Sequence, residues 1–274
     1  MRPIELFINP QRKQAGTGAS LNDFSLAEAS RVRSFHKSFR EYVSTPLVPL
    51  NRLAATLGVG SILLKDESKR MGLNAFKMLG GSYAIARILA ERLGRPIDGL
   101  TRDELASPAI RKQIGDITFV TATDGNHGRG VAWTAQQLGQ KAVVFMPKGS
   151  AEVRAEAIRA TGAECYITEF NYDDAVRHAD KYADEHGGVM VQDTAWEGYE
   201  DIPRWIMQGY MTMALECMEQ IRETGRTMPT HLFLQAGVGS FAGSTLGCFA
   251  AALGDTMPQT IIVEPHEADC IYKS

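Results

Sequence analysis

Lys77 is the residue of this 274-residue sequence whose position most favours covalent chemistry. It follows the apolar run Ser61–Leu64, which is expected to be a buried strand, and then a polar loop. Helical periodicity begins near Lys77, with Leu79, Ile85, Ile88 and Leu89 on one face. A helix start disfavours a positive charge, and partial burial would disfavour it further. Both effects favour the neutral amine, which is the form that builds a Schiff base. A solvated lysine in a first helical turn is the competing interpretation.

A second segment suited to chemistry is Thr121–Gly128, with the sequence TATDGNHG, where a strand is expected to end and a helix to begin. The backbone N–H groups of such a turn suit an anion, and ligands of open α/β sheets bind at the carboxyl ends of the strands. Simple capping of the helix by Asp124 or Asn126 is the alternative. Asp193 also follows an expected strand, in VQDTAWEGY, and there the alternative is a cap of a helix containing Trp196.

Glycines mark the third segment, Leu234–Gly243, which reads LQAGVGSFAG. Glycine lets the backbone approach an anion, and the helix that follows supplies N–H groups and its dipole. Gly237, Gly239 and Gly243, with Glu264 about twenty residues later at the next strand end, resemble a dinucleotide-binding motif. The spacing between the glycines is one residue longer than in that motif. The segment therefore predicts a phosphate site, and a nicotinamide cofactor stays open as one occupant.

The spacing of apolar runs predicts an α/β fold with a parallel sheet and helical crossovers. A helix capped by Ser25 is expected to run to about Tyr42, and a long helix is expected from beyond Trp196 to about Glu223. The expected strands are Thr118–Thr121, Ala142–Met146, Cys165–Thr168, Val189–Val191, His231–Gln235 and Thr260–Glu264, and the remaining helices are Val131–Leu138, Ala151–Ala160, Asp173–Glu185 and Phe241–Leu253. Residues 1 to about 24 are expected to form an irregular arm.

Composition excludes several classes of function. The net charge is −3 without a basic block, which argues against nucleic acid and anionic membranes as partners. Apolar runs are too short to span a membrane, and no signal peptide begins the sequence, so a cytoplasmic location is expected. The four cysteines are scattered, which predicts no metal site and no disulfide framework. Cys270 is expected to be inert, with a regulatory disulfide to an unidentified partner left open.

The acidic pair Asp66-Glu67, the glycine-containing loop and Ala75-Phe76-Lys77 resemble the lysine motif of fold type II pyridoxal-phosphate enzymes. Most members have Ser or Thr where this chain has Ala75. The resemblance covers the chain from about Thr45, because the Asp-Gly-Asn loop and the glycine loop follow in the family's order. It implies a tryptophan-synthase-β-like fold of two parallel-sheet αβα domains, the larger one incomplete. The implied divisions are 1–74 (arm and start of the large domain), 75–205 (small domain) and 206–274 (large domain, continued).

The same resemblance implies pyridoxal 5′-phosphate as the cofactor, bonded to Lys77. Asn126 would hydrogen-bond the cofactor's phenolic oxygen, and the glycine loop would bind its phosphate through Gly237, Val238, Gly239 and Ser240. His127 is expected to pack or to lie near the cofactor. A family member would continue well beyond Ser274, where the residue facing the pyridine nitrogen normally lies. We therefore expect a fragment with exposed strand edges or apolar faces, and poor stability and little activity if the chain is complete.

Within the family, Asp124 and Asp193 make the chain most similar to the ammonia-lyases that act on 2,3-diaminopropionate. Thr123 and the loop amides would hold the substrate carboxylate, and Asp193 would bind its ammonium group. Asp124 or Lys77 would remove the α-proton, depending on the enantiomer, and pyruvate and ammonia would form in a cytoplasmic homodimer that degrades amino acids. A threonine/serine dehydratase, a cysteine-synthase-like β-replacement enzyme and a nicotinamide-binding module remain alternatives.

Overall fold

The computed structural model describes residues 4–10 and 20–273. Part of the expected N-terminal arm, residues 1–3 and 11–19, lies outside the described residues. The helices are η1 (Leu21–Phe24), α1 (Leu26–His36), α2 (Asn51–Leu57), η2 (Glu67–Gly72), α3 (Lys77–Arg92), α4 (Arg102–Leu105), α5 (Pro108–Ile114), α6 (Asn126–Gln137), α7 (Glu152–Arg159), α8 (Tyr172–His186), α9 (Asp201–Glu223), α10 (Ser240–Leu253), η3 (Gly254–Thr256) and α11 (Cys270–Lys273). The strands are β1 (Leu47–Pro49), β2 (Leu63–Lys65), β3 (Thr118–Ala122), β4 (Lys141–Met146), β5 (Glu164–Ile167), β6 (Val189–Met190), β7 (His231–Gln235) and β8 (Gln259–Val263).

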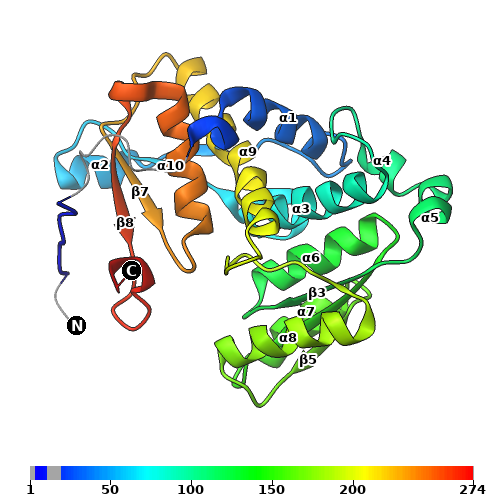
Figure 1. Cartoon of the computed structure of the whole chain (residues 1–274). Coiled ribbons are helices and arrows are strands. Elements are labelled where there is room, and N and C mark those ends of the chain that lie inside the picture. The colour runs from blue at the N-terminus through cyan, green and yellow to red at the C-terminus, as the bar shows by residue number, and fades with distance from the viewer. Residues whose placement is uncertain (1–3, 11–19, 274) are drawn as a thin grey trace.

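A four-stranded parallel sheet with the order β5-β4-β3-β6 forms one side of the molecule (Figure 1). The strands β3 and β4 are covered on both faces, which explains their continuous apolar sequence. Phe119 and Val144 point to the face that packs with α6 and α7, whereas Val120 and Phe145 belong to a separate cluster with the alanines of α8. The crossover pattern and the parallel sheet that the sequence predicts are confirmed.

Helix α3 lies between α6 and α9, and close backbone contacts fix its first turns there. A Cβ at Gly209 of α9 would lie 2.3 Å from the backbone oxygen of Leu79, and a Cβ at Gly130 of α6 would lie 2.8 Å from Met78 Cα. Glycine is therefore required at both positions. The side chain that begins α3, Lys77, is held at the junction of three helices.

We predict that Gly209→Ala destabilises the chain by about 1–3 kcal/mol, because the added methyl group forces α9 away from α3. Gly60→Ala is the matched control, since a Cβ at Gly60 meets nothing within 4 Å. Urea unfolding followed by circular dichroism measures both variants. Equal midpoints would contradict the close packing of α9 on α3.

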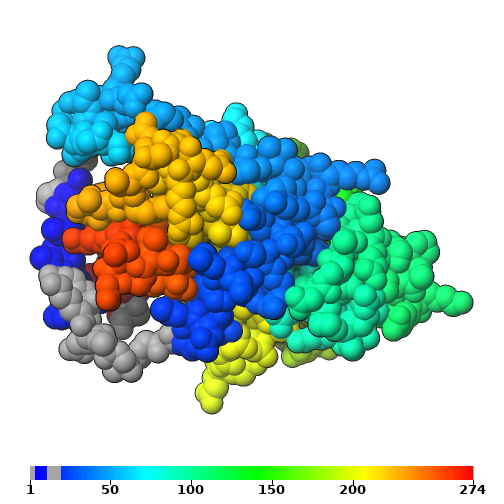
Figure 2. All heavy atoms as spheres, turned by 90° about the horizontal axis from the view of Figure 1, so that it is seen from above, coloured from blue at the N-terminus to red at the C-terminus, as the bar shows by residue number. Residues whose placement is uncertain are grey.

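A second, smaller sheet contains the parallel strands β7 and β8, joined by α10, and β1 and β2, joined by α2, form a two-stranded antiparallel sheet. Seen from above, α1 (blue) lies between α10 (orange-red) and the residues near 100 (teal) (Figure 2). Phe233 of β7 is 67% exposed and Val263 of β8 is 51% exposed. The apolar strand faces that we expected to find exposed are present on this sheet.

Several predicted boundaries need correction. The helix capped by Ser25, whose Oγ accepts from the Glu28 N–H at 3.2 Å, ends at His36 rather than near Tyr42. The run Ser61–Leu64 is not a buried strand, because β2 has three half-buried or exposed residues that pair only with the equally short β1. The predicted strand His231–Gln235 is found with the same bounds, and the other predicted strands and helices are found with ends shifted by one or more residues.

The domain divisions remain a prediction, although α9 runs without a break across the one after residue 205. In the part of the chain that the structure describes, no helix has the length and apolar character needed to cross a membrane.

Candidate active site

Lys77 and Asp193 form a part-buried ion pair. Lys77 is the first residue of α3, and its Nζ donates to Asp193 Oδ2 at 2.6 Å. Asp193 follows β6 and is 4% exposed. A turn with a Trp196–Tyr199 bridge occupies the position where a capped helix was the alternative, so the capping interpretation of Asp193 is wrong. A solvated Lys77 is also excluded, since 27% of its side chain is exposed.

The expectation that Lys77 is driven to a neutral amine is wrong for this structure. Burial acts to lower the pKa of Lys77, but the neighbouring Tyr210 and Asp193 outweigh it and raise that pKa above its ordinary value. Burial likewise acts to raise the pKa of Asp193, while His127 and Lys77 bring it below its usual range. Because burial lowers the pKa of His127 itself, Lys77 is the cation that keeps Asp193 ionised. The position of Lys77 at a helix start and its partial burial were predicted from the sequence, but its ion pair with Asp193 was not.

His127 lies against the same carboxylate. Its ring is 4% exposed, and Nε2 donates to the backbone oxygen of Val191 at 2.8 Å. The other ring nitrogen, Nδ1, is 3.9 Å from Asp193 Oδ2 and has no hydrogen-bond partner. His127 was expected to pack or to lie near the cofactor. In the structure it is buried beside Asp193, the residue that also binds Lys77.

The loop between β3 and α6 presents two polar side chains. Asp124 and Asn126 are exposed, and α6 begins at Asn126 without a side-chain cap, so neither residue is the helix cap that the alternative required. Thr123 is 2% exposed, and its Oγ1 accepts from the Gly125 N–H at 3.0 Å. Arg154 donates to the backbone oxygen of Asp124 at 3.0 Å, which fixes the loop from outside.

The glycine loop reaches the same centre from β7. Gly239 has a φ of +92°, and α10 begins at Ser240, whose Oγ donates to the backbone oxygen of Asp193. A Cβ at Gly237 would meet nothing within 4 Å. Among the described residues, the N–H groups of Val238, Gly239 and Ser240 have no hydrogen-bond partner. An open cradle of free N–H groups at a helix start fits a phosphate.

Asp193 thus connects all three segments that the sequence singled out. Its carboxylate holds Lys77 and faces His127, and its backbone oxygen accepts from Ser240. Sequence reasoning missed two aromatic neighbours, Tyr172 of α8 and Tyr210 of α9. Burial raises the pKa of Tyr172 to about 12 and that of Tyr210 further, so both hydroxyls are neutral. Aromatic residues inside helices carry no sequence signal that separates such neighbours from core residues.

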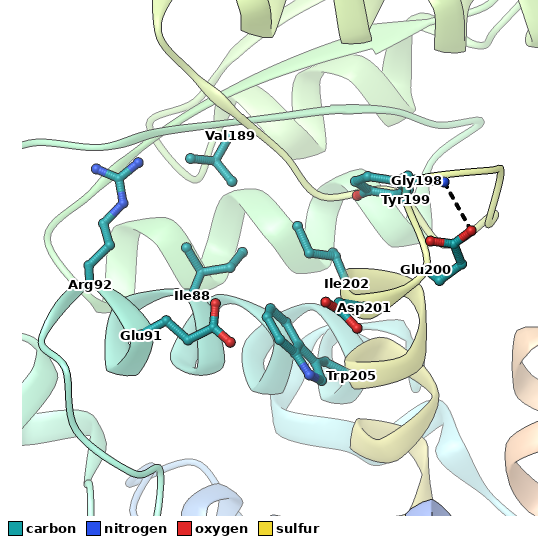
Figure 3. A pocket seen from close by; sticks show the side chains of 10 residues that line it. All are labelled: Ile88, Glu91, Arg92, Val189, Gly198, Tyr199, Glu200, Asp201, Ile202 and Trp205. Carbon is teal, nitrogen blue, oxygen red and sulfur yellow. Dashed lines mark hydrogen bonds between the residues drawn. The ribbon is translucent and has the colours of Figure 1, made fainter. Parts of the chain in front are cut away.

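A separate pocket lies away from this centre. It measures about 510 Å³ between the second half of α3, β6 and the start of α9, where Ile88, Val189 and Trp205 face Glu91, Arg92 and Asp201 (Figure 3). None of the residues that line it belongs to the Lys77 centre. Nor do the described residues contain a cluster of metal-binding side chains.

Comparison with known proteins agrees with this geometry. The family model of pyridoxal-phosphate dependent enzymes matches residues 39–274. Diaminopropionate ammonia-lyase of Salmonella typhimurium is 56% identical over 271 residues, which are 99% of this chain and 67% of that protein. The enzyme of Escherichia coli K12 with the same name is 55% identical over 252 residues, which are 92% of this chain and 62% of that protein.

A solved structure of the holo Escherichia coli diaminopropionate ammonia lyase superimposes with a TM-score of 0.88 at 54% identity, covering 92% of this chain and 63% of that one. Another structure of that enzyme contains an aminoacrylate-PLP azomethine reaction intermediate. This chain therefore spans about two thirds of the length of these relatives.

The match to the family rests on most of the chain rather than on one motif. It confirms the fold type II resemblance, the expected α/β fold class and pyridoxal phosphate as the family's cofactor. The nicotinamide interpretation is set aside, since Glu264 accepts the N–H groups of Ile271 and Tyr272 at 2.8 and 3.0 Å instead of facing a ribose. The chain belongs to the family of pyridoxal-phosphate-dependent enzymes.

Proposed function

We propose that the protein is an ammonia-lyase that converts 2,3-diaminopropionate to pyruvate and ammonia with pyridoxal 5′-phosphate. The observation that carries the proposal is the 56% identity to an enzyme of that name over nearly the whole chain. The cofactor, when bound, supplies the electron sink that lets Cα lose its proton and the β-amino group depart.

Lys77 would bond to the cofactor, because its amine is part-buried and lies beside groups that can take its proton. The loop Gly237, Val238, Gly239 and Ser240 would bind the phosphate through its free N–H groups. Asn126, exposed at the start of α6, would hydrogen-bond the cofactor's phenolic oxygen.

The substrate carries two amino groups, and the site carries two carboxylates to match them. Asp193 would bind the ammonium group of the substrate, since opposite charges within several ångström favour both ionised forms. Thr123 and the loop amides would hold the substrate carboxylate. The buried Thr123 hydroxyl accepts the Gly125 N–H with one lone pair, and its own O–H remains free to donate to a carboxylate oxygen.

The test of the proposed function is the product. Protein mixed with cofactor and 2,3-diaminopropionate should form pyruvate and ammonia, and threonine should give little 2-oxobutyrate. A threonine dehydratase of Salmonella typhimurium is 28% identical over 229 residues, so preferential formation of 2-oxobutyrate would replace our proposal with that activity.

Asp124→Asn should reduce elimination from one enantiomer of 2,3-diaminopropionate by about 10²–10⁴-fold and from the other far less, because a general base contributes that factor on one face of the substrate. Rates with the separate D and L substrates measure this. Asp173→Asn is the control, because Asp173 lies on α8 outside the centre. Equal loss with both enantiomers would argue against Asp124 as a stereospecific base.

We also propose that the protein acts in the cytoplasm as a homodimer that degrades amino acids. The support is the absence of a membrane-spanning helix among the described residues and the general frequency of twofold assemblies. Light scattering on purified protein should give twice the mass of one chain, and a monomer would refute the dimer.

A further inference from the structure

His127 has an unused ring nitrogen inside the Lys77 centre. Its Nε2 lies 2.8 Å from a carbonyl oxygen, which can only accept, so Nε2 carries the proton. Nδ1 is buried, has no partner and is 3.9 Å from Asp193 Oδ2. The lone pair of Nδ1 therefore faces the Asp193 carboxylate without a proton between them. A proton on Nδ1 would turn this contact into a hydrogen bond between an imidazolium and a carboxylate.

Lys77 requires a proton acceptor nearby if its amine is to become neutral. Its amine is a nucleophile and a base only when neutral, yet in this structure it is the ammonium partner of Asp193. On its inner side the amine meets side chains rather than water, because those of His127 and Asp193 are only 4% and 3% exposed, whereas that of Lys77 is 27% exposed. A proton that leaves Lys77 meets Asp193 first, at 2.6 Å, and His127 behind it.

We propose that His127 and Asp193 store the proton of Lys77: when the amine becomes neutral, His127 Nδ1 takes the proton and donates to the Asp193 carboxylate. The N–H bond of Lys77 breaks, its electron pair stays on the amine nitrogen, and an N–H bond forms at Nδ1. Charge is conserved, because an ammonium–carboxylate pair becomes an imidazolium–carboxylate pair. A small rotation of the Asp193 carboxylate, whose terminal torsion is broad, closes the gap.

The charges around His127 support this exchange. Burial lowers the pKa of His127 and the Lys77 charge lowers it further, whereas Asp193 and Asp124 raise it. His127 is therefore neutral while Lys77 is charged. Once the Lys77 charge is removed, both carboxylates favour the imidazolium, and Tyr172, the neutral neighbour from α8, does not oppose it.

The inference deepens the proposed function but is tested without cofactor or activity. Nitrogen NMR on histidine-labelled protein reports the protonation of each ring nitrogen. In the unmodified chain at neutral pH, His127 Nδ1 should give the signal of an unprotonated nitrogen. In Lys77→Gln and Lys77→Met, that signal should move to the protonated region, with the ratio of imidazolium to imidazole rising about tenfold or more.

Lys77→Arg is the matched control, because it keeps a positive charge beside Asp193, and His127 should stay neutral. Adding Asp193→Asn to Lys77→Gln should return His127 to the neutral form, since the stabilising carboxylate is gone. A neutral His127 in the folded Lys77→Gln or Lys77→Met variant, or a protonated His127 in the unmodified chain, would overturn the proposal. If the enzyme forms no pyruvate from 2,3-diaminopropionate, the proposed function is wrong. The nitrogen NMR signals of His127 do not depend on that result, so the two proposals are tested separately.

Discussion

Replacing Lys77 with alanine should abolish formation of pyruvate from 2,3-diaminopropionate and remove the visible absorbance that pyridoxal phosphate gives when bonded to the protein. Lys77 is the part-buried lysine at the start of α3, and its Nζ is the amine that Asp193 holds in the centre. Without it, the cofactor has no amine there with which to bond. Absorbance spectra and product assays, before and after borohydride treatment, measure the effect.

Lys148→Ala is the control, because the Lys148 side chain is 69% exposed and pairs only with an exposed glutamate on the surface. It should leave both the absorbance and the activity unchanged. Peptide mapping of the unmodified protein after borohydride should find the cofactor on Lys77. Cofactor fixed to another lysine, or visible absorbance that survives in Lys77→Ala, would refute the assignment.

Local patterns in the sequence predicted most of the helices and strands, and they marked the segments that the structure brings together at Asp193. The short apolar runs of β3 and β4 alternate with helical segments, and this order predicted strands because a covered parallel sheet needs continuous apolar strands. The predicted position of Lys77 at a helix start is confirmed by α3. Helix starts and strand positions depend on residues close together in the sequence, so the sequence alone predicts them.

Features that depend on distant residues could not be predicted. The charge state of Lys77 is decided by Asp193, 116 residues away, and the orientation of His127 by the backbone of Val191. The run Ser61–Leu64 was wrongly expected to be a buried strand, because β2 pairs only with β1 and the Lys65 side chain at its end reaches Glu216 and Gln220 of α9. Contacts between residues far apart in the sequence produce no periodic pattern from which they could be predicted.

The ionic cluster beneath the loop that precedes Lys77 is such a long-range feature. Arg70 is fully buried and donates to both oxygens of Glu216, at 2.9 and 2.8 Å, and to both oxygens of Glu67. Lys65 adds a contact of 2.8 Å to Glu216. Two cations and two anions thus tie the loop to α9. The same loop contains Met71 and Asn74 at positive φ, an unfavourable conformation that such surroundings can maintain.

Replacing Glu216 with glutamine should destabilise the protein by about 3–5 kcal/mol, because it removes the carboxylate that pairs with the ammonium of Lys65 and leaves the buried guanidinium of Arg70 with Glu67 alone. That loss is a large part of the total stability of an ordinary domain, roughly 5–15 kcal/mol. Urea unfolding, followed by circular dichroism, measures the free energy difference.

The same substitution should remove a pH dependence. Burial opposes the charge on Glu216, but hydrogen bonds and attraction from Arg70 and then Lys65 lower its pKa from 4.5 to about 2 in the folded chain. A lowered folded pKa stabilises the protein above the unfolded value, and the stabilisation is lost as the pH falls from 4.5 through about 2. Unfolding free energies across this range should fall more steeply for the unmodified chain than for Glu216→Gln.

Glu219→Gln is the matched control one turn further along α9. Glu219 also binds an arginine, Arg33, but its side chain is 39% exposed, so water replaces the lost pairing and the expected loss is about 0–1 kcal/mol. Equal losses for the two glutamates would show that burial does not amplify the Glu216 cluster. A large loss for Glu216 alone, with a lower affinity for pyridoxal phosphate, is expected, because the cluster holds the loop that places Lys77 at the start of α3.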